Sequence, residues 1–259
     1  MPLKERKKAL ELLYRFRHIF SNRDNEISFI NIEPYKIHLH DETPFNVRPY
    51  KSSAPERDNA RNILDSLEKS GVIYKTNSEY CSPAFIKTKP NGKSRLLNDY
   101  RTLNKKITNN CNTVPRIEAI FEAIKNAPVI SSMDLSHGYY QFPIHEDCQK
   151  FLGFRLDSSP MYAFTRLPQG LKISAAVTTQ ATYEVFSDIF FKGFIAYIDD
   201  YCTYSNDIDS HLQILEEVLK RLETYNFKLN PDKCEFFENI ITLLGHDIGN
   251  GQIKPSKKM

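Results

Sequence analysis

FIAYIDDYCTYS, residues 194–205, places two adjacent carboxylates, Asp199 and Asp200, between two short runs of apolar and aromatic residues. The runs 194–198 and 201–204 have the composition of strands, so the segment predicts a β-hairpin with both acids at its tip. Two-residue hairpin loops favour Asn-Gly, Asp-Gly or a leading glycine, because at least one central residue takes a positive φ. Two carboxylates about 4 Å apart repel by roughly 4 kcal/mol at an effective dielectric of 20, and a cation between them offsets that repulsion. The pair is therefore either a solvated acidic turn or part of a cation site.

A third carboxylate ends another strand-like run. VISSM, residues 129–133, is followed directly by Asp134. Neighbouring strands lie about 5 Å apart, so a strand beside the hairpin would let Asp134 and Asp199 share a metal ion. Hard oxygen ligands without His or Cys favour Mg²⁺.

Composition indicates an ordinary globular protein. The chain has 259 residues, of which 41% are hydrophobic and 26% charged, enough for one large domain or two subdomains. No stretch approaches the apolar length of a membrane span, and the basic N-terminus lacks the apolar core of a secretory signal, so we expect an intracellular protein. The five cysteines are widely spaced and form no Cys-x-x-Cys pair, which argues against a disulfide framework or a zinc knuckle.

The charges are distributed unevenly along the chain. Residues 1–110 hold 21 Lys and Arg against 13 Asp and Glu, whereas residues 111–259 hold 14 against 19. The densest basic stretch is 85–106, where seven cations accompany a single acid, Asp99. The stretch is either a solvated surface or a phosphate-binding element that gains affinity by releasing counterions from nucleic acid.

Helical and strand patterns alternate along the chain. Apolar spacing predicts helices within 53–71, which opens with a Ser53-x-x-Glu56 capping box, and within 115–128 and 209–227. Further strands are predicted at 139–144 and 240–248. Helices interspersed with hairpins predict an α+β fold in which a sheet packs on one face and leaves the other free.

Six motifs then occur in a fixed order. They are GVIYKTNSEYCSPAFIKTKPNGKSRLLNDYRTLN (71–104), SMDLSHGYYQ (132–141), FTRLPQGLK (164–172), YIDD (197–200), LNPDKCEFF (229–237) and LLGHDI (243–248). With them, the chain resembles the reverse transcriptase domain of long-terminal-repeat retroelements, nearest to the Ty3/gypsy group with some retrovirus-like features. The resemblance runs from about Pro44 to Lys257 and implies a polymerase right-hand fold with fingers and palm, the palm sheet being antiparallel and backed by helices.

The resemblance implies an RNA-directed DNA polymerase that adds dNTPs to a primer 3′-hydroxyl by two-metal nucleotidyl transfer. Asp134, Asp199 and Asp200 would be catalytic and would hold two Mg²⁺ ions, with Mn²⁺ as a substitute and the Leu135 carbonyl as a further ligand. Of the three, Asp200 has the weakest case for direct coordination of the metal.

Further contacts follow from the same resemblance. Nucleotide binding is expected of Lys89, Arg95, Tyr139, Gln169 and Lys233, with Tyr139 against the 2′ position of the sugar and Lys233 as proton donor to pyrophosphate. Template or primer binding is expected of Tyr197, Ile198, Leu244, Gly245 and His246. Structural alternatives stand beside several of these roles: surface charge for Lys89 and Arg95, a core aromatic for Tyr140 rather than Tyr139, and an ordinary turn glycine for Gly245.

The domain organisation is expected to follow the family. Residues 1–40 would be an N-terminal extension, 41–108 and 142–172 fingers, 109–141 and 173–253 palm, and 254–259 the start of a connection to a thumb that the chain lacks. Expected partners are an RNA template, a DNA primer or product duplex and dNTPs, together with protease, RNase H and integrase domains of a polyprotein that lie outside this chain. No membrane partner is expected, and the location would be cytoplasmic, including retroelement particles.

Four positions depart from the family's usual pattern. They are Ser94, Gln169, the Ala175–Ala176 pair and Thr178. These departures leave the three aspartates intact. Two other functions stay open: an RNA-synthesising polymerase, against which Tyr139 argues, and a non-catalytic nucleic-acid-binding scaffold or domesticated element with the same fold.

Overall fold

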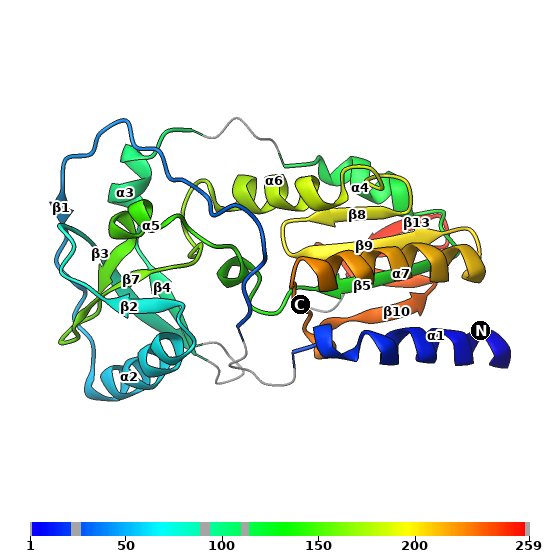
Figure 1. Cartoon of the computed structure of the whole chain (residues 1–259), viewed down its shortest axis with the longest axis horizontal. Coiled ribbons are helices and arrows are strands. Elements are labelled where there is room, and N and C mark those ends of the chain that lie inside the picture. Colours follow the sequence, from blue (N-terminus) through cyan, green and yellow to red (C-terminus); the bar gives the residue numbers. More distant parts are fainter. Residues whose placement is uncertain (1, 22–26, 89–93, 110–113, 257–259) are drawn as a thin grey trace. The chain divides into compact units, whose positions relative to one another are not determined.

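The computed structural model describes residues 2–21, 27–88, 94–109 and 114–256 (Figure 1). None of the helices within these ranges is long and apolar enough to cross a membrane. The chain divides into two compact units, each with its own sheet. The first unit comprises Met1–Asn22, Asn112–Gly138 and Ala175–Met259, and the second comprises Arg23–Cys111 and Tyr139–Ser174.

The first unit is built on a four-stranded antiparallel sheet. Its strands, in spatial order, are β10 (Glu235–Glu238), β5 (Val129–Asp134), β9 (Asp200–Ser205) and β8 (Phe194–Tyr197). Side chains alternate between the two faces of a strand, and residues paired across strands share a face. The pairs Ile130↔Tyr204 and Ser132↔Cys202 therefore lie on one face, and Ser131↔Thr203 lies on the other.

The face that carries Ile130 and Cys202 is covered by α4 (Ile117–Ile124) and a three-stranded meander. The meander consists of β11 (Ile240–Leu243), β12 (His246–Gly249) and β13 (Gln252–Pro255). Residues of α4, β5, β8, β9, β11 and β12 form one buried apolar cluster, which includes Ile120, Ile124, Ile195, Ile241 and Ile248. The apolar face predicted for the helix within 115–128 is thus the face that α4 packs into this core.

The opposite face of the sheet is covered by α6 (Ser174–Phe186) and α7 (Ile208–Thr224). Phe186 of α6 stacks on Phe194 of β8 with ring centroids 4.4 Å apart, and Figure 1 shows α7 along β9 and β5, which it contacts. Helix α1 (Leu3–Arg15) packs on α7, where Arg15 Nη1 lies 2.8 Å from Glu216 Oε1. Both faces of the sheet are therefore covered, and the expectation of one free face is wrong.

The second unit holds a mixed six-stranded sheet. Its strands are β1 (Phe45–Asn46), β3 (Tyr80–Thr88), β6 (Gly153–Arg155), β7 (Met161–Phe164) and β2 (Ile73–Lys75) in that order, with β4 (Ser94–Asn98) paired to β3. Its helices are α2 (Ala54–Lys69), α3 (Arg101–Lys106) and α5 (Glu146–Gln149). The capping box predicted at α2 is confirmed, since the Ser53 backbone N–H donates to Glu56 Oε2 at 2.7 Å.

Most of the elements predicted from periodicity are present. The three helices appear as α2, α4 and α7, and the segment 240–248 forms two strands, β11 and β12. The strand predicted at 139–144 is wrong, because Gly138–Gln141 form a 3₁₀ helix and Pro143 and Ile144 make isolated bridges only. A short apolar run does not distinguish a buried strand from other buried backbone, and here the Phe142 N–H donates back to the Tyr139 carbonyl at 3.2 Å.

Candidate active site

The hairpin β8–β9 turns one residue earlier than its sequence predicts. Tyr197 pairs with Asp200, so the loop consists of Ile198 and Asp199, and Asp200 is the first residue of β9. Ile198 has a φ of 59°, the left-handed value that the first loop residue needs. That conformation is costly for a β-branched residue, by about 1–3 kcal/mol, and such strain clusters at functional sites.

The strand register brings the carboxylates of Asp200 and Asp134 together. Asp134, the last residue of β5, is the cross-strand partner of Asp200, and directly opposed residues have Cβ atoms about 4.5–5.5 Å apart. The Leu135 N–H donates to the Asp199 carbonyl at 3.2 Å, which ties the hairpin loop to the end of β5. Asp134, Asp199 and Asp200 therefore converge at one end of the sheet. This confirms the prediction that Asp134, at the end of its strand, lies beside the hairpin at 194–205.

Gly138 provides the space that Asp199 occupies. A Cβ at position 138 would lie 2.9 Å from Asp199 Cβ and 3.3 Å from Asp199 Oδ2. Contacts below 3.0 Å force a shift of the neighbouring group, so any side chain at this position would displace Asp199. Sequence reasoning assigned Gly138 no role, because its contact lies 61 residues away along the chain.

Lys233 lies against the carboxylate of Asp134. Its Nζ is 3.1 and 2.9 Å from Asp134 Oδ1 and Oδ2, and its side chain is 59% exposed whereas that of Asp134 is 17% exposed. Lys233 ends the 3₁₀ helix Pro231–Lys233, which is anchored because the Asn230 N–H donates to the Asp134 carbonyl at 2.9 Å. Both ends of this segment are therefore tied to the strand that carries Asp134.

The electrostatics of the site favour a cation. Burial of Asp200 and repulsion from Asp199 and Asp134 raise the pKa of Asp200 to about 6, while Lys233 acts in the opposite direction. No group of three or more His, Cys, Asp or Glu side chains within 2–21, 27–88, 94–109 and 114–256 has the arrangement of a formed metal site. The donors are nevertheless all oxygens whose mutual repulsion a hard divalent cation would relieve, so the residues fit Mg²⁺.

The residues expected to bind the nucleotide lie on several elements of the second unit, apart from Lys233. Arg95 is exposed on β4 opposite Lys87, Tyr139 is half-buried in its 3₁₀ helix, and Gln169 is half-buried in the loop after β7. Lys89 lies outside the residues that the structure describes. The neighbouring Tyr140 stacks on Phe164 with centroids 5.7 Å apart, and burial raises its pKa to about 12, as expected of a core aromatic.

The loop that carries Gln169 is held by a side chain that sequence reasoning missed. Asn104 Nδ2 donates to the Gly170 carbonyl at 2.9 Å, and the Lys172 N–H donates to Asn104 Oδ1 at 2.9 Å. Gly170 has a φ of 97°, which a residue with a side chain rarely adopts. Asn104 thus fixes the backbone on the C-terminal side of Gln169.

The residues expected to contact template or primer lie on two hairpin turns of the first unit. Tyr197 and Leu244 pack against the same apolar cluster beneath the sheet. Leu244 and Gly245 have φ values of 49° and 76° and join β11 to β12. His246 Nδ1 lies 3.1 Å from the Leu244 carbonyl and its ring centroid 5.1 Å from that of Phe121.

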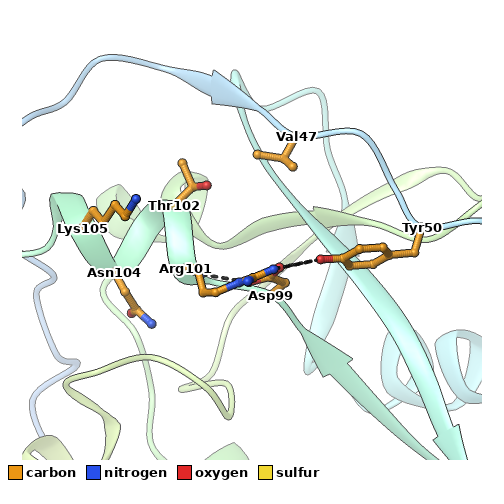
Figure 2. A pocket seen from close by; sticks show the side chains of 7 residues that line it. All are labelled: Val47, Tyr50, Asp99, Arg101, Thr102, Asn104 and Lys105. Carbon is orange, nitrogen blue, oxygen red and sulfur yellow. Dashed lines mark hydrogen bonds and ion pairs between the residues drawn. The ribbon is translucent and has the colours of Figure 1, made fainter.

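A pocket of about 530 Å³ lies in the second unit (Figure 2). Its lining consists of Val47, Tyr50, Asp99, Arg101, Thr102, Asn104 and Lys105. Arg101 Nη2 and Nε lie 2.6 and 2.8 Å from Asp99 Oδ2 and Oδ1, and Tyr50 Oη donates to Asp99 Oδ2 at 2.6 Å. The guanidinium of Arg101 and the hydroxyl of Tyr50 hold the pKa of Asp99 well below its usual range. Asp99, the one acid in the basic stretch 85–106, is thus ion-paired with Arg101 of the same stretch.

The architecture is that of the fingers and palm of a right-hand polymerase. Solved structures of the foamy viral protease-reverse transcriptase share it: the complex with RNA/DNA hybrid has a TM-score of 0.92 at 25% identity, covering 100% of this chain and 34% of that chain. The complex with dsDNA has a TM-score of 0.90 at 26% identity, covering 100% and 54%. The family model described as reverse transcriptase (RNA-dependent DNA polymerase) matches residues 86–248. The chain therefore belongs to the reverse transcriptase family, whose members generally use divalent metal ions.

Similar proteins come from retroelements and foamy viruses. The Pol polyprotein of the Drosophila melanogaster transposon 412 is 31% identical over 246 residues, which cover 93% of this chain and 20% of the polyprotein. The Pol polyprotein of transposon gypsy is 26% identical over 251 residues, covering 95% and 24%. The Pro-Pol polyprotein of simian foamy virus type 1 is 26% identical over 253 residues, covering 95% and 21%. The chain thus spans between a fifth and a quarter of these relatives, and the resemblance to Ty3/gypsy elements with retrovirus-like features is confirmed.

Proposed function

We propose that the chain is an RNA-directed DNA polymerase that extends a primer 3′-hydroxyl with dNTPs. The observation that carries the proposal is the pairing of Asp134 with Asp200 at the end of the palm sheet, with Asp199 beside them and Lys233 on Asp134. Three converging carboxylates are costly in a purely structural role, because each raises the pKa of its neighbours. The repulsion is relieved when the carboxylates bind metal cations, and those cations can then bind the phosphates of a nucleotide.

The three aspartates and the Leu135 carbonyl would hold two Mg²⁺ ions, or Mn²⁺ in their place. When bound, such ions lower the pKa of the primer hydroxyl and stabilise charge on the triphosphate. The primer 3′-hydroxyl gives its proton to water and its oxygen attacks the α-phosphorus of the dNTP, while the bond to the bridging oxygen breaks and pyrophosphate leaves. The ammonium group of Lys233 donates a proton to that leaving group, and Asp134 keeps the ammonium oriented.

The remaining contacts follow the family's division into fingers and palm. Arg95 and Lys89 neutralise the triphosphate, Gln169 touches the nucleotide or templating base, and the Tyr139 ring excludes a ribose 2′-hydroxyl. Tyr197 and Ile198 from one hairpin and Leu244, Gly245 and His246 from the other contact template or primer. The likeness to polymerases solved with RNA/DNA hybrid and dsDNA supports an RNA template and a DNA primer or product as partners. The polyprotein relatives support further domains as neighbours.

Primer extension on an RNA template, with Mg²⁺ and dNTPs, tests the proposal. We expect Asp199→Asn to lower the rate by about 100-fold or more, as removal of an electrostatic catalytic group does. Asp209→Asn is the control, since Asp209 is 68% exposed on α7 and pairs with Lys8. Equal rates for parent and Asp199→Asn would contradict the site.

Two further arms of the same experiment separate the alternatives. Replacing dNTPs with NTPs distinguishes a DNA polymerase from an RNA-synthesising one, because the Tyr139 ring is expected to exclude ribose. Duplex binding by a chain that extends no primer would instead favour a nucleic-acid-binding scaffold.

A further inference from the structure

His211 is fully buried on the side of the sheet opposite the carboxylates. It lies in the first turn of α7, with 0% of its surface exposed. Its ring meets Ser131 of β5, Thr203 and Ser205 of β9 and, edge to face at 5.0 Å, Phe237 of β10. These contacts include no charged group, and burial lowers the pKa of His211 to about 4. The imidazole is therefore neutral at physiological pH.

The hydrogen-bond partners of His211 determine which ring nitrogen carries the proton. Ser205 Oγ donates its proton to the Asp207 carbonyl at 2.8 Å, so at 3.1 Å from His211 Nδ1 it accepts the ring proton. The other ring nitrogen, Nε2, then carries no proton and accepts from Ser131 Oγ at 2.7 Å. Ser131 Oγ, having donated to His211, accepts from the backbone N–H of Phe237 at 3.0 Å. A single chain of bonds thus links α7, β5 and β10.

The last bond of this chain lies in a β-bulge. The ladder pairs Glu235 with Ser132 and Glu238 with Ile130, so two residues of β10 oppose the single residue Ser131 of β5. Phe237 has a φ of 59°, and its N–H points at the Ser131 hydroxyl. The hydroxyl therefore acts as the acceptor for the N–H of the bulged residue. It fixes the register of β10 on β5.

That register sets one of the two attachments that place Lys233, because β10 begins two residues after it, while the Asn230 N–H on the Asp134 carbonyl is the other. Without the bulge, β10 would slip by one residue, about 3.3 Å, and Lys233 would move relative to Asp134. We propose that His211 is a positioning residue: through the Ser131 hydroxyl it holds the bulge of β10 and thereby keeps the Lys233 ammonium on Asp134. The proposal deepens the proposed function, since it rests on Lys233 acting at that site.

A matched pair of variants tests the proposal. His211→Gln keeps an acceptor for the Ser131 hydroxyl, whereas His211→Met, of similar length, offers no comparable acceptor. Acetylation of lysines, quantified by peptide mass spectrometry, reports the Lys233 contact without any need for activity. Lys220 is the internal control, because it is 54% exposed and ion-paired to Glu216 at 3.1 Å.

We expect His211→Met to raise the acetylation rate of Lys233 about fivefold, the factor that loss of a hydrogen bond worth about 1 kcal/mol gives. Lys220 should react as in the parent, and His211→Gln should restore protection of Lys233. Amide exchange at 235–238 should accelerate in parallel. In an active parent, His211→Met should lower the extension rate at saturating dNTP and leave the KM for dNTP unchanged.

The outcomes separate this inference from the proposed function. An inactive parent whose Lys233 is nevertheless exposed by His211→Met would contradict the function and support the positioning role. An active parent in which His211→Met changes neither Lys233 acetylation nor the rate would overturn the positioning role. Equal increases at Lys233 and Lys220 would also overturn it, because they indicate general loosening. Where His211→Met does not fold, Ser131→Ala removes the same acceptor from Phe237 and carries the same expectations.

Discussion

The Lys233 ammonium nitrogen lies 2.9 and 3.1 Å from the two carboxylate oxygens of Asp134, a residue 99 positions earlier in the chain. The contact joins the motif at 229–237 to the end of β5. It places a proton donor beside the acids that are proposed to hold the metal ions. Lys233 is 59% exposed, so the pair contributes little to stability by itself.

Lys233→Gln should therefore reduce chemistry more than folding. A positioned general acid contributes about 10²–10⁴ in rate, so we expect at least a 100-fold slower single-turnover incorporation at saturating dNTP. Duplex affinity and the thermal midpoint should stay near those of the parent. Rapid-quench kinetics with Lys220→Gln as the control measure this difference. A rate within twofold of the parent would exclude the proton-donor role.

Gly138→Ala should disturb the site through Asp199. The added Cβ would approach Asp199 Cβ to 2.9 Å, and overpacking of this kind costs about 1–3 kcal/mol. We expect at least a tenfold loss of extension rate, since the Asp199 loop has to shift, with a smaller effect on duplex binding. Parallel measurements of rate and denaturant stability check this, and unchanged activity would show that the loop adapts at no cost.

Asn104→Ala should act on nucleotide binding. The substitution removes both hydrogen bonds that hold the backbone at Gly170 and Lys172, each worth about 1 kcal/mol. The freed loop carries Gln169, so the KM for dNTP should rise about tenfold while the rate at saturating dNTP changes less. Asn109→Ala is the matched control, because Asn109 Oδ1 accepts from the Lys172 side chain at 2.9 Å, whereas Asn104 holds the backbone of the loop. Equal KM values for the two variants would contradict a role for the Asn104 clamp.

Local sequence patterns predicted the elements but not the turn at the site. The helices α2, α4 and α7 follow from apolar spacing and capping, which are encoded within each segment. The hairpin at 194–205 was predicted correctly, but its loop is Ile198-Asp199 rather than Asp199-Asp200. Turn propensities disfavour a left-handed isoleucine, and the pairing of β9 with β5 overrides that preference.

The aspartates could be predicted because they belong to motifs, whereas their supports could not. Gly138, Asn104 and His211 act through contacts 61 or more residues away, or through a buried chain of hydroxyls. Such contacts depend on strand register and loop placement, which no single segment encodes. The strand expected at 139–144 failed for the same reason, because backbone partners outside the segment, such as the Thr165 carbonyl at 3.0 Å from Ile144 N, determine its conformation.

His211 should make the fold sensitive to acid. Its pKa is about 4 in the folded chain and about 6.5 when unfolded, so both states are neutral above pH 6.5. Between pH 6.5 and 4 only the unfolded chain binds the proton, and the free energy of unfolding falls as the pH falls. The loss should be roughly 2 kcal/mol between pH 7 and pH 5, and little further change should come from this group below pH 4. Urea titrations of the parent and His211→Gln measure this loss. The contributions of carboxylates that both proteins share cancel when the two free energies of unfolding are subtracted. The difference between the two free energies of unfolding should therefore shrink by roughly 2 kcal/mol from pH 7 to pH 5. Parallel stability curves across this range would show that the ring takes up a proton in the folded chain as readily as in water.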